Sequence, residues 1–256
     1  MMAPRKIAVT GSTGRVGRHV VDALEARGHD VVPISRTAGV DVITGESLDD
    51  ALVGVDAIVD TATDPSPEEE AATAFFTTAA RYLQDAGARA GVERIVVVSI
   101  IGTDRFTGGY GAAKLAHEET SLAGPVPACV LRAAQFHEFV SQMVDWGRDG
   151  DVSYVPKMRT QLVAARAVAE KLADLATETG PGRESEIPEI AGPQVETLAG
   201  AARLLSARRR DGLRVEEVSD PDDPNGRLYE SGALLPGPGA TLVGPTFEQW
   251  LAREYP

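Results

Sequence analysis

The stretch Thr10-Gly-Ser-Thr-Gly-Arg-Val-Gly17 decides the fold of this 256-residue chain. Its three glycines stand between a short apolar run and a helical pattern, the context in which such spacing is informative. Gly11 permits a tight turn, Gly14 lets the backbone approach a pyrophosphate, and Gly17 lets the following helix pack closely. The start of that helix offers N–H groups and partial positive charge to phosphates. The stretch therefore predicts a dinucleotide-binding loop. Its expected cofactor contacts are Gly11, Ser12, Thr13, Gly14, Arg15, Val16 and Gly17.

Outward from this loop, the first half of the chain alternates short β-branched runs with helical patterns, which is typical of βαβ units. Val16, Val20 and Leu24 recur at helical spacing, and Gly28 stands where a left-handed cap is needed. A long helix is expected over residues 67–90, with glutamates in its first turn. The strands expected in this half are 6–10, 30–35, 55–60, 94–99 and 128–131.

The pattern weakens after about residue 132. Strands are still expected over 152–155, 187–190 and 214–218, and helices over 163–177 and 194–207. We therefore predict an α/β fold: a Rossmann-type, doubly wound parallel sheet in one domain of residues 1–256. Residues 133–256 would contribute a smaller, substrate-facing lobe.

The residues after the second expected strand bear on cofactor choice. Sites that prefer NAD carry Asp or Glu there, to accept from the ribose hydroxyls. This chain has Ser35-Arg36 instead, and a guanidinium matches a 2′-phosphate. Arg15 offers a second positive charge. The sequence thus favours NADP(H) over NAD(H).

A Tyr-x-x-x-Lys pair opens another predicted helix. Its i, i+4 spacing places Tyr110 and Lys114 on one helix face. A nearby ammonium lowers the pKa of a phenol, which then exchanges a proton with a carbonyl or alcohol near neutral pH. Ser99 ends a strand at the carboxyl edge of the sheet, where its hydroxyl can polarise the same oxygen. Ser99, Tyr110 and Lys114 are the predicted catalytic residues.

The chain resembles an atypical member of the extended short-chain dehydrogenase/reductase superfamily, in its NmrA-like, NAD(P)H-binding branch. The segments that carry the resemblance are Thr10–Gly17, Gly54–Asp56 leading into Val59–Ala62, Ala90–Ser99, Tyr110–Lys114 and Leu131–Phe139.

The resemblance implies several roles. Thr61, Ala62 and Thr63 would line the adenosine half of the cofactor, and Lys114 would hold the nicotinamide ribose. The catalytic serine of the superfamily falls on Ser99 or on the next position, Ile100. Beside the nicotinamide the resemblance places Ala133, Ala134, Gln135 and Phe136.

The histidines divide into two groups. His19, His29 and His117 fall on predicted helix surfaces or turns, where a solvated imidazole is expected. His137 and Glu138 follow a strand at the active edge of the sheet and are candidate substrate contacts. No spacing of histidines and carboxylates suggests a metal site.

Composition excludes other classes of function. The formal net charge of −13 disfavours nucleic acid and anionic membranes as partners. A single cysteine, Cys129, excludes an intramolecular disulfide. No stretch has the length or apolarity of a membrane span or a signal core. We expect a cytoplasmic monomer or homodimer.

The leading hypothesis is an NADP(H)-dependent oxidoreductase that acts on a small-molecule carbonyl, quinone or enone. Two alternatives stay open: a non-catalytic regulator that senses NADP, and a biosynthetic cyclase or epimerase on the same fold. The identity of the substrate depends on the shape of a pocket, which sequence patterns do not describe.

Overall fold

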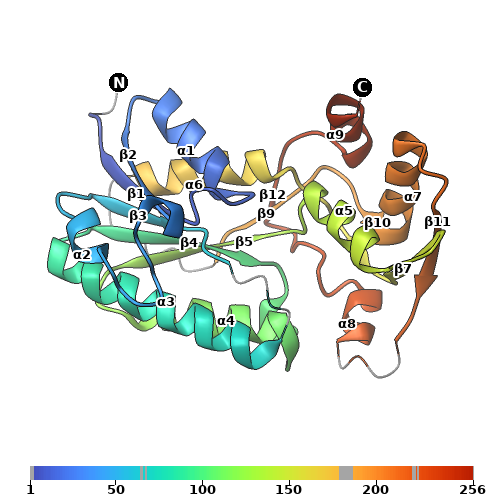
Figure 1. The fold of residues 1–256 in the computed structure, drawn as a ribbon, viewed down its shortest axis with the longest axis horizontal. Coiled ribbons are helices and arrows are strands. Elements are labelled where there is room, and N and C mark those ends of the chain that lie inside the picture. Colours follow the sequence, from blue (N-terminus) through green and yellow to red (C-terminus); the bar gives the residue numbers. More distant parts are fainter. Residues whose placement is uncertain are drawn as a thin grey trace. The chain divides into compact units, whose positions relative to one another are not determined.

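The computed structural model describes residues 3–63, 66, 68–178, 187–220, 223 and 225–255. Seven strands form a parallel sheet in the order β12-β9-β5-β4-β3-β1-β2 (Figure 1). This arrangement confirms the predicted Rossmann-type α/β fold. The strands are β1 (Lys6–Thr10), β2 (Asp30–Ile34), β3 (Ala57–Asp60), β4 (Arg94–Ile100), β5 (Ala128–Ala133), β9 (Glu189–Ala191) and β12 (Thr241–Leu242).

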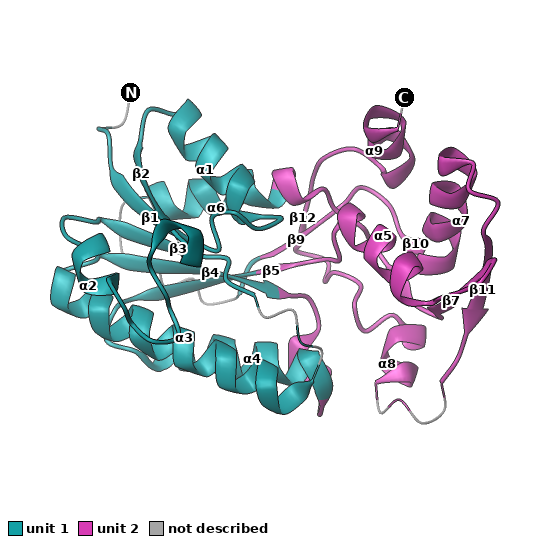
Figure 2. Ribbon diagram, viewed as in Figure 1, with its two compact units in different colours: residues 1–99, 109–131, 168–188 teal, residues 100–108, 132–167, 189–256 magenta. Residues whose placement is uncertain are grey.

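The chain divides into two compact units (Figure 2). Unit 1 consists of residues 1–99, 109–131 and 168–188, and unit 2 of residues 100–108, 132–167 and 189–256. Each unit thus combines three chain segments, whereas the sequence pattern suggested a single boundary, with the second lobe formed by residues 133–256. The prediction of one domain with a substrate-facing lobe stays a prediction.

Helices cover both faces of the sheet in unit 1. In Figure 1, α1 and α6 lie on one face, and α3 and α4 lie side by side on the other. Arg27 after α1 supports the first pairing, because its guanidinium lies 2.8 Å from Asp174 of α6. Burial on both faces explains why the strands read as nearly continuous apolar runs. The helices of this unit are α1 (Gly17–Ala26), α2 (Leu48–Ala51), α3 (Glu69–Ala90), α4 (Gly109–Ala123) and most of α6 (Ala165–Thr177).

Helix ends in unit 1 follow the expected chemistry. Gly28 has a φ of +82° and Gly91 a φ of +76°, the left-handed conformation that ends a helix and favours glycine. Glu69 in the first turn of α3 also reaches the start of α4, where its Oε2 accepts from Gly109 N at 2.7 Å. This bond ties together the beginnings of the two helices. Pro67, the predicted first residue of α3, lies outside the described residues.

Unit 2 has its own apolar core, in which Val140 of α5, Val155 of β7 and Phe247 of α9 are completely buried. The helix expected from residue 194 begins only at Leu198. The reason is that Thr197 caps it, accepting from Gly200 N at 3.1 Å, after pairing with Arg159 in a short antiparallel ladder. The remaining elements are α5 (His137–Trp146), β6 (Arg148–Asp149), β7 (Val152–Pro156), β8 (Arg159–Thr160), β10 (Glu196–Thr197), α7 (Leu198–Arg209), β11 (Arg214–Val218), α8 (Gly226–Ser231) and α9 (Phe247–Glu254).

In the described part of the chain, no helix is both long and apolar enough to span a bilayer.

Candidate cofactor and catalytic site

The glycine loop closes tightly on the end of β3. Gly11 has a φ of +59°, and a Cβ there would lie 2.7 Å from the Thr61 carbonyl oxygen. A Cβ on Gly17 would lie 2.2 Å from the Gly11 carbonyl oxygen and 2.7 Å from Thr61 Oγ1. At either position a side chain would force the neighbouring backbone to shift. The helix start therefore packs on the loop itself and on the residue after β3.

The beginning of α1 is built to receive an anion. Its N-cap residue is Val16, which has no side chain able to cap the helix, and no acidic residue stands in the first turn. The dipole end and its N–H groups are therefore not neutralised by this helix's own side chains. A Cβ on Gly14 would lie 3.0 Å from the Gly11 carbonyl oxygen, so a side chain at this position would also be crowded. The cradle fits the pyrophosphate of a dinucleotide.

The end of β2 lies beside this cradle. Ile34 pairs with Thr10 in the sheet, so residues 35 and 36 emerge at the same edge as the glycine loop. Ser35 Oγ accepts from Ala38 N at 3.2 Å and caps a short 3-10 turn over Arg36–Ala38. Arg36 is exposed and forms no ion pair with any described residue.

Residues 61–63 connect the loop to α4. Thr61 Oγ1 donates to the Thr10 carbonyl oxygen at 2.6 Å, which holds the segment after β3 against the glycine loop. Tyr110 OH lies 2.9 Å from Thr63 Oγ1. The ring of Tyr110 meets Phe76 of α3 edge to face, with centroids 5.6 Å apart. The structure thus brings the predicted phenol to the segment that was expected to line the cofactor.

Ser99 is buried, with 2% of its surface exposed, and its Oγ has no hydrogen-bond partner in the described structure. Side chains alternate along a strand, so Ser99 faces the same way as Ile95 and Val97. Those two pack in a core cluster with Leu83 of α3, on the face of the sheet that α4 also covers. Ile100, the alternative position for the serine, belongs to unit 2 and packs against that unit's core.

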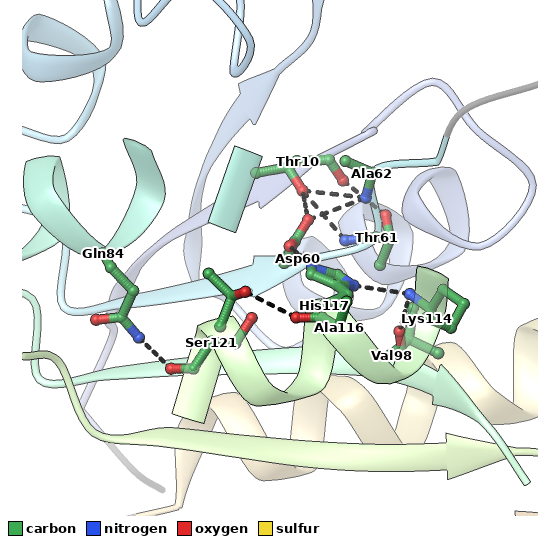
Figure 3. A network of polar contacts seen from close by, with 11 residues as sticks. Thr10, Asp60, Thr61, Ala62, Gln84, Val98, Lys114, Ala116, His117 and Ser121 are labelled. Atoms are coloured by element: carbon green, nitrogen blue, oxygen red, sulfur yellow. Dashed lines mark hydrogen bonds and ion pairs between the residues drawn. The ribbon is translucent and has the colours of Figure 1, made fainter. Parts of the chain in front are cut away.

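Lys114 lies inside unit 1, with 5% of its surface exposed. Its Nζ donates to the Val98 carbonyl oxygen at 2.9 Å and lies 2.9 Å from His117 Nδ1 (Figure 3). The ring of Phe76 lies beneath the ammonium, 4.5 Å from Nζ to the centroid. Lys114 and Tyr110 therefore share Phe76 as a packing partner.

His117 corrects the sequence analysis, which expected a solvated imidazole. The side chain is 1% exposed and stacks on Phe76, with centroids 4.9 Å apart. Its Nε2 lies 2.9 Å from Asp60 Oδ2 at the end of β3. Figure 3 shows His117 between Asp60 and Lys114. The expectation was wrong because α3 covers the face of α4 that carries His117. Local features mark the two residues separately but not their pairing: Asp60 is a carboxylate ending an apolar strand, and His117 stands three residues after Lys114 on the same helix face.

The pKa values of this group reflect its burial. Burial alone raises the pKa of Asp60, but the hydrogen bond and charge of His117, with bonds from Thr10 and Ala62, lower it to about 2. Burial lowers the pKa of Lys114 to about 8, against the opposing charges of Asp60 and Glu118. Burial and the neighbouring Lys114 lower the pKa of His117. The imidazole is therefore neutral and Asp60 ionised at neutral pH.

The remaining predicted contacts lie in unit 2. Gln135 Oε1 accepts from Thr160 Oγ1 at 2.7 Å, and Glu138 Oε2 accepts from Ala165 N at 3.3 Å. His137 is completely buried; its Nε2 lies 3.1 Å from the Pro245 carbonyl oxygen. Burial lowers the pKa of His137 to about 4, so its imidazole is neutral at neutral pH and packs in the core of unit 2. The predicted roles of residues 133–138 beside cofactor and substrate stay predictions, and His137 is not part of the function proposed below.

Comparisons with known proteins agree with this geometry. Residues 11–123 match the family model described as NAD(P)H-binding. A short-chain dehydrogenase/reductase superfamily protein from Agrobacterium tumefaciens with bound NAD superposes with a TM-score of 0.67 at 20% identity, over 97% of this chain and 95% of that chain. An NADPH-dependent quinone oxidoreductase from Escherichia coli has a TM-score of 0.67 at 17% identity, over 98% and 100% of the two chains.

A nucleoside-diphosphate-sugar epimerase from Pseudomonas aeruginosa has a TM-score of 0.70 at 19% identity, over 98% of this chain and 96% of that one. No curated protein matches the sequence significantly. At these identities the solved structures establish the fold. Together with the family model they confirm the predicted resemblance.

Proposed function

Because residues 11–123 of this chain match an NAD(P)H-binding family model and the fold is that of short-chain dehydrogenase/reductase superfamily structures, we propose that the protein is an NADP(H)-dependent oxidoreductase. Its substrate would be a small-molecule carbonyl, quinone or enone. The observation that carries this proposal is the position of Tyr110 and Lys114 against Phe76, with Tyr110 OH 2.9 Å from Thr63 Oγ1.

The glycine loop would hold the cofactor through backbone N–H groups. Gly11, Gly14 and Gly17 leave no room for side chains near the start of α1, and Ser12, Thr13, Arg15 and Val16 complete the loop. An unneutralised helix start stabilises a pyrophosphate. Thr61, Ala62 and Thr63 would line the adenosine half.

The preference for NADP(H) rests on the end of β2. Arg36 is exposed and has no described ion-pair partner, so its guanidinium is available to a 2′-phosphate. Ser35 fixes the turn that carries Arg36 by capping it. An aspartate at this place would instead repel the phosphate.

The bound cofactor would supply or accept the hydride. Tyr110 would donate its phenolic proton to the substrate oxygen during reduction and take it back during oxidation. Lys114 would hold the ribose, and its positive charge would favour the phenolate. Ser99, whose buried hydroxyl has no described partner, would donate to the substrate oxygen. A buried hydroxyl without a partner costs free energy, and a bound ligand would remove that cost.

The test is a screen of quinones, aldehydes and ketones for NADPH oxidation, with cofactor binding measured in parallel by fluorescence. Turnover of one of these classes supports the proposal. Binding of NADPH without turnover of any of them would favour the sensing regulator, and isomerisation without net NADPH consumption would favour the epimerase.

A further inference from the structure

A buried chain of hydrogen bonds runs from Thr10 through Asp60 and His117 to Lys114 of α4, and each bond in it has a defined donor and acceptor. Thr10 Oγ1 accepts from Thr61 N at 3.1 Å and from Ala62 N at 3.2 Å. Its own hydrogen is therefore left for Asp60 Oδ1, 2.5 Å away. Ala62 N also donates to Asp60 Oδ1 at 3.0 Å. The carboxylate thus acts only as an acceptor, as an ionised group must.

The second oxygen of the carboxylate decides the tautomer of His117. Because Asp60 Oδ2 can only accept, the proton of the neutral imidazole resides on Nε2, 2.9 Å away. Nδ1 then carries a lone pair and accepts from Lys114 Nζ at 2.9 Å. A proton on Nδ1 would instead face the N–H bonds of the ammonium.

This tautomer orients the ammonium. A protonated lysine has three N–H bonds, of which one goes to the Val98 carbonyl oxygen and one to His117 Nδ1. The third N–H has no hydrogen-bond partner among the described residues, and the ring of Phe76 lies 4.5 Å from Nζ. Loss of a proton from Lys114 would leave a lone pair in place of this third N–H, because both protein partners are acceptors.

We propose that His117 is a positioning residue for Lys114: Asp60 holds His117 in its Nε2–H tautomer, and His117 in turn directs one N–H of Lys114 towards the ribose of the bound dinucleotide. This inference rests on the proposed function for the identity of the ligand. The arrangement of the three side chains stands independently of it. Thr10 is both the end of β1 and the first residue of the glycine stretch. These hydrogen bonds therefore also link the cofactor loop to α4.

Among the described residues, three titratable groups act on or contact Lys114. Asp60 comes from β3, and His117 and Glu118 come from α4. The charges of Asp60 and Glu118 oppose the lowering of the Lys114 pKa by burial. Removing the Asp60 charge should therefore bring the deprotonation of Lys114 to lower pH.

The first test needs no variant and no substrate. Nitrogen-15 NMR of the histidine-labelled, cofactor-free protein should show His117 as the neutral Nε2–H tautomer at neutral pH. An imidazolium or an Nδ1–H tautomer would overturn the proposal. Asp60→Asn, whose amide donates where Oδ2 accepted, should convert His117 to the Nδ1–H tautomer. Thermal unfolding and the remaining amide spectrum show whether that variant keeps its fold.

The second test uses two variants that separate the two bonds of His117. Asn can place an amide oxygen where Nδ1 lies, so His117→Asn should preserve the bond to Lys114. Gln can place an amide nitrogen where Nε2 lies, so His117→Gln should preserve the bond to Asp60 alone. His29→Asn is the matched control. His29 lies just before β2, at the end of that strand opposite the Arg36 turn, and the one described hydrogen bond of its ring is accepted by Nδ1 from Arg5 N.

Two readouts follow these variants: the Lys114 Cε chemical shift without cofactor, and NADPH affinity between about pH 7 and pH 9.5, above the ordinary titration of a phosphate. NADPH affinity of the unmodified protein should fall as Lys114 deprotonates. In Asp60→Asn and His117→Gln the midpoint should move down by about one pH unit, which roughly halves the protonated fraction of Lys114 at pH 7. Loss of the oriented N–H should in addition weaken NADPH binding at neutral pH roughly tenfold. His117→Asn and His29→Asn should stay near the unmodified values.

Equal midpoints in His117→Asn and His117→Gln would overturn the positioning role. If NADPH does not bind at all, the proposed function fails, while the tautomer and the Lys114 shift still decide this inference. If NADPH binds with no dependence on Asp60 or His117, the inference fails and the proposed function stands.

Discussion

Thr63 Oγ1 lies 2.9 Å from Tyr110 OH, so the segment after β3 meets the first turn of α4 through two hydroxyl groups. The contact holds the phenol at the edge of the sheet where parallel α/β proteins bind their ligands. The ring of Tyr110 packs on Phe76, whereas its hydroxyl is the group for which we propose proton exchange.

Tyr110→Phe removes only the hydroxyl and keeps the ring contact with Phe76. We expect NADPH affinity and thermal stability to change little. The turnover number for a confirmed substrate should fall by on the order of a hundredfold or more, because a positioned general acid is lost. Stopped-flow or steady-state NADPH oxidation measures it. Tyr82→Phe, at a half-exposed position on α3, is the control and should turn over normally. Turnover by Tyr110→Phe at the unmodified rate would remove Tyr110 from the mechanism.

Arg36→Ala tests the choice of cofactor. The unmodified protein should bind NADPH more tightly than NADH, and the variant should lose most of that difference. A charged hydrogen bond contributes about 1.5–3 kcal/mol, so NADPH affinity should fall by roughly tenfold to a hundredfold while NADH affinity stays nearly constant. Isothermal titration with both cofactors measures this. Arg253→Ala changes net charge equally at an exposed site in unit 2 and should have no effect. Equal binding of both cofactors by the unmodified protein would contradict the prediction.

Gly17→Ala tests the close packing of the glycine loop. The new Cβ would lie 2.2 Å from the Gly11 carbonyl oxygen, so the loop must move. We expect a loss of about 1–3 kcal/mol in the free energy of unfolding, and weaker NADPH binding because the cradle opens. Denaturant unfolding and cofactor titration measure the two effects. Gly239→Ala is the control, since a Cβ there meets no atom within 4 Å. A variant as stable as the control would show that the loop adapts without cost.

The ionisation of Asp60 should appear in the acid stability of the protein. Its pKa in the folded state is about 2, below the ordinary aspartate value of 3.8, so the folded state binds fewer protons than the unfolded state between these two pH values. The resulting stabilisation is fully present above about pH 4 and is lost as the pH falls towards 2. Its size is on the order of 2 kcal/mol. The difference in unfolding free energy between the unmodified protein and Asp60→Asn should therefore shrink with acid. Asp22→Asn, at an exposed carboxylate on α1, should follow the unmodified protein. A difference that does not change with pH would contradict the assignment.

The sequence by itself determined the fold and the position of the candidate site along the chain. The glycine stretch predicted the turn at Gly11 because a φ of +59° favours a residue without Cβ. The Tyr-x-x-x-Lys spacing placed Tyr110 and Lys114 on one face of α4, since helical periodicity is a local property. Apolar runs predicted buried parallel strands for the same reason. Each of these conclusions depends on residues within a few positions of one another.

Only the tertiary structure decided what surrounds Lys114. Asp60 and His117 stand 57 positions apart in the chain, and no local pattern relates them. The periodicity of α4 does not reveal that Phe76 of α3 covers His117, because that burial depends on how two helices pack on one face of the sheet. Burial then sets the ionisation of all three groups, since the cost of a charge depends on the surroundings it meets after folding. The residues proposed for proton chemistry were readable in the sequence, but the group proposed to orient Lys114 was created by packing.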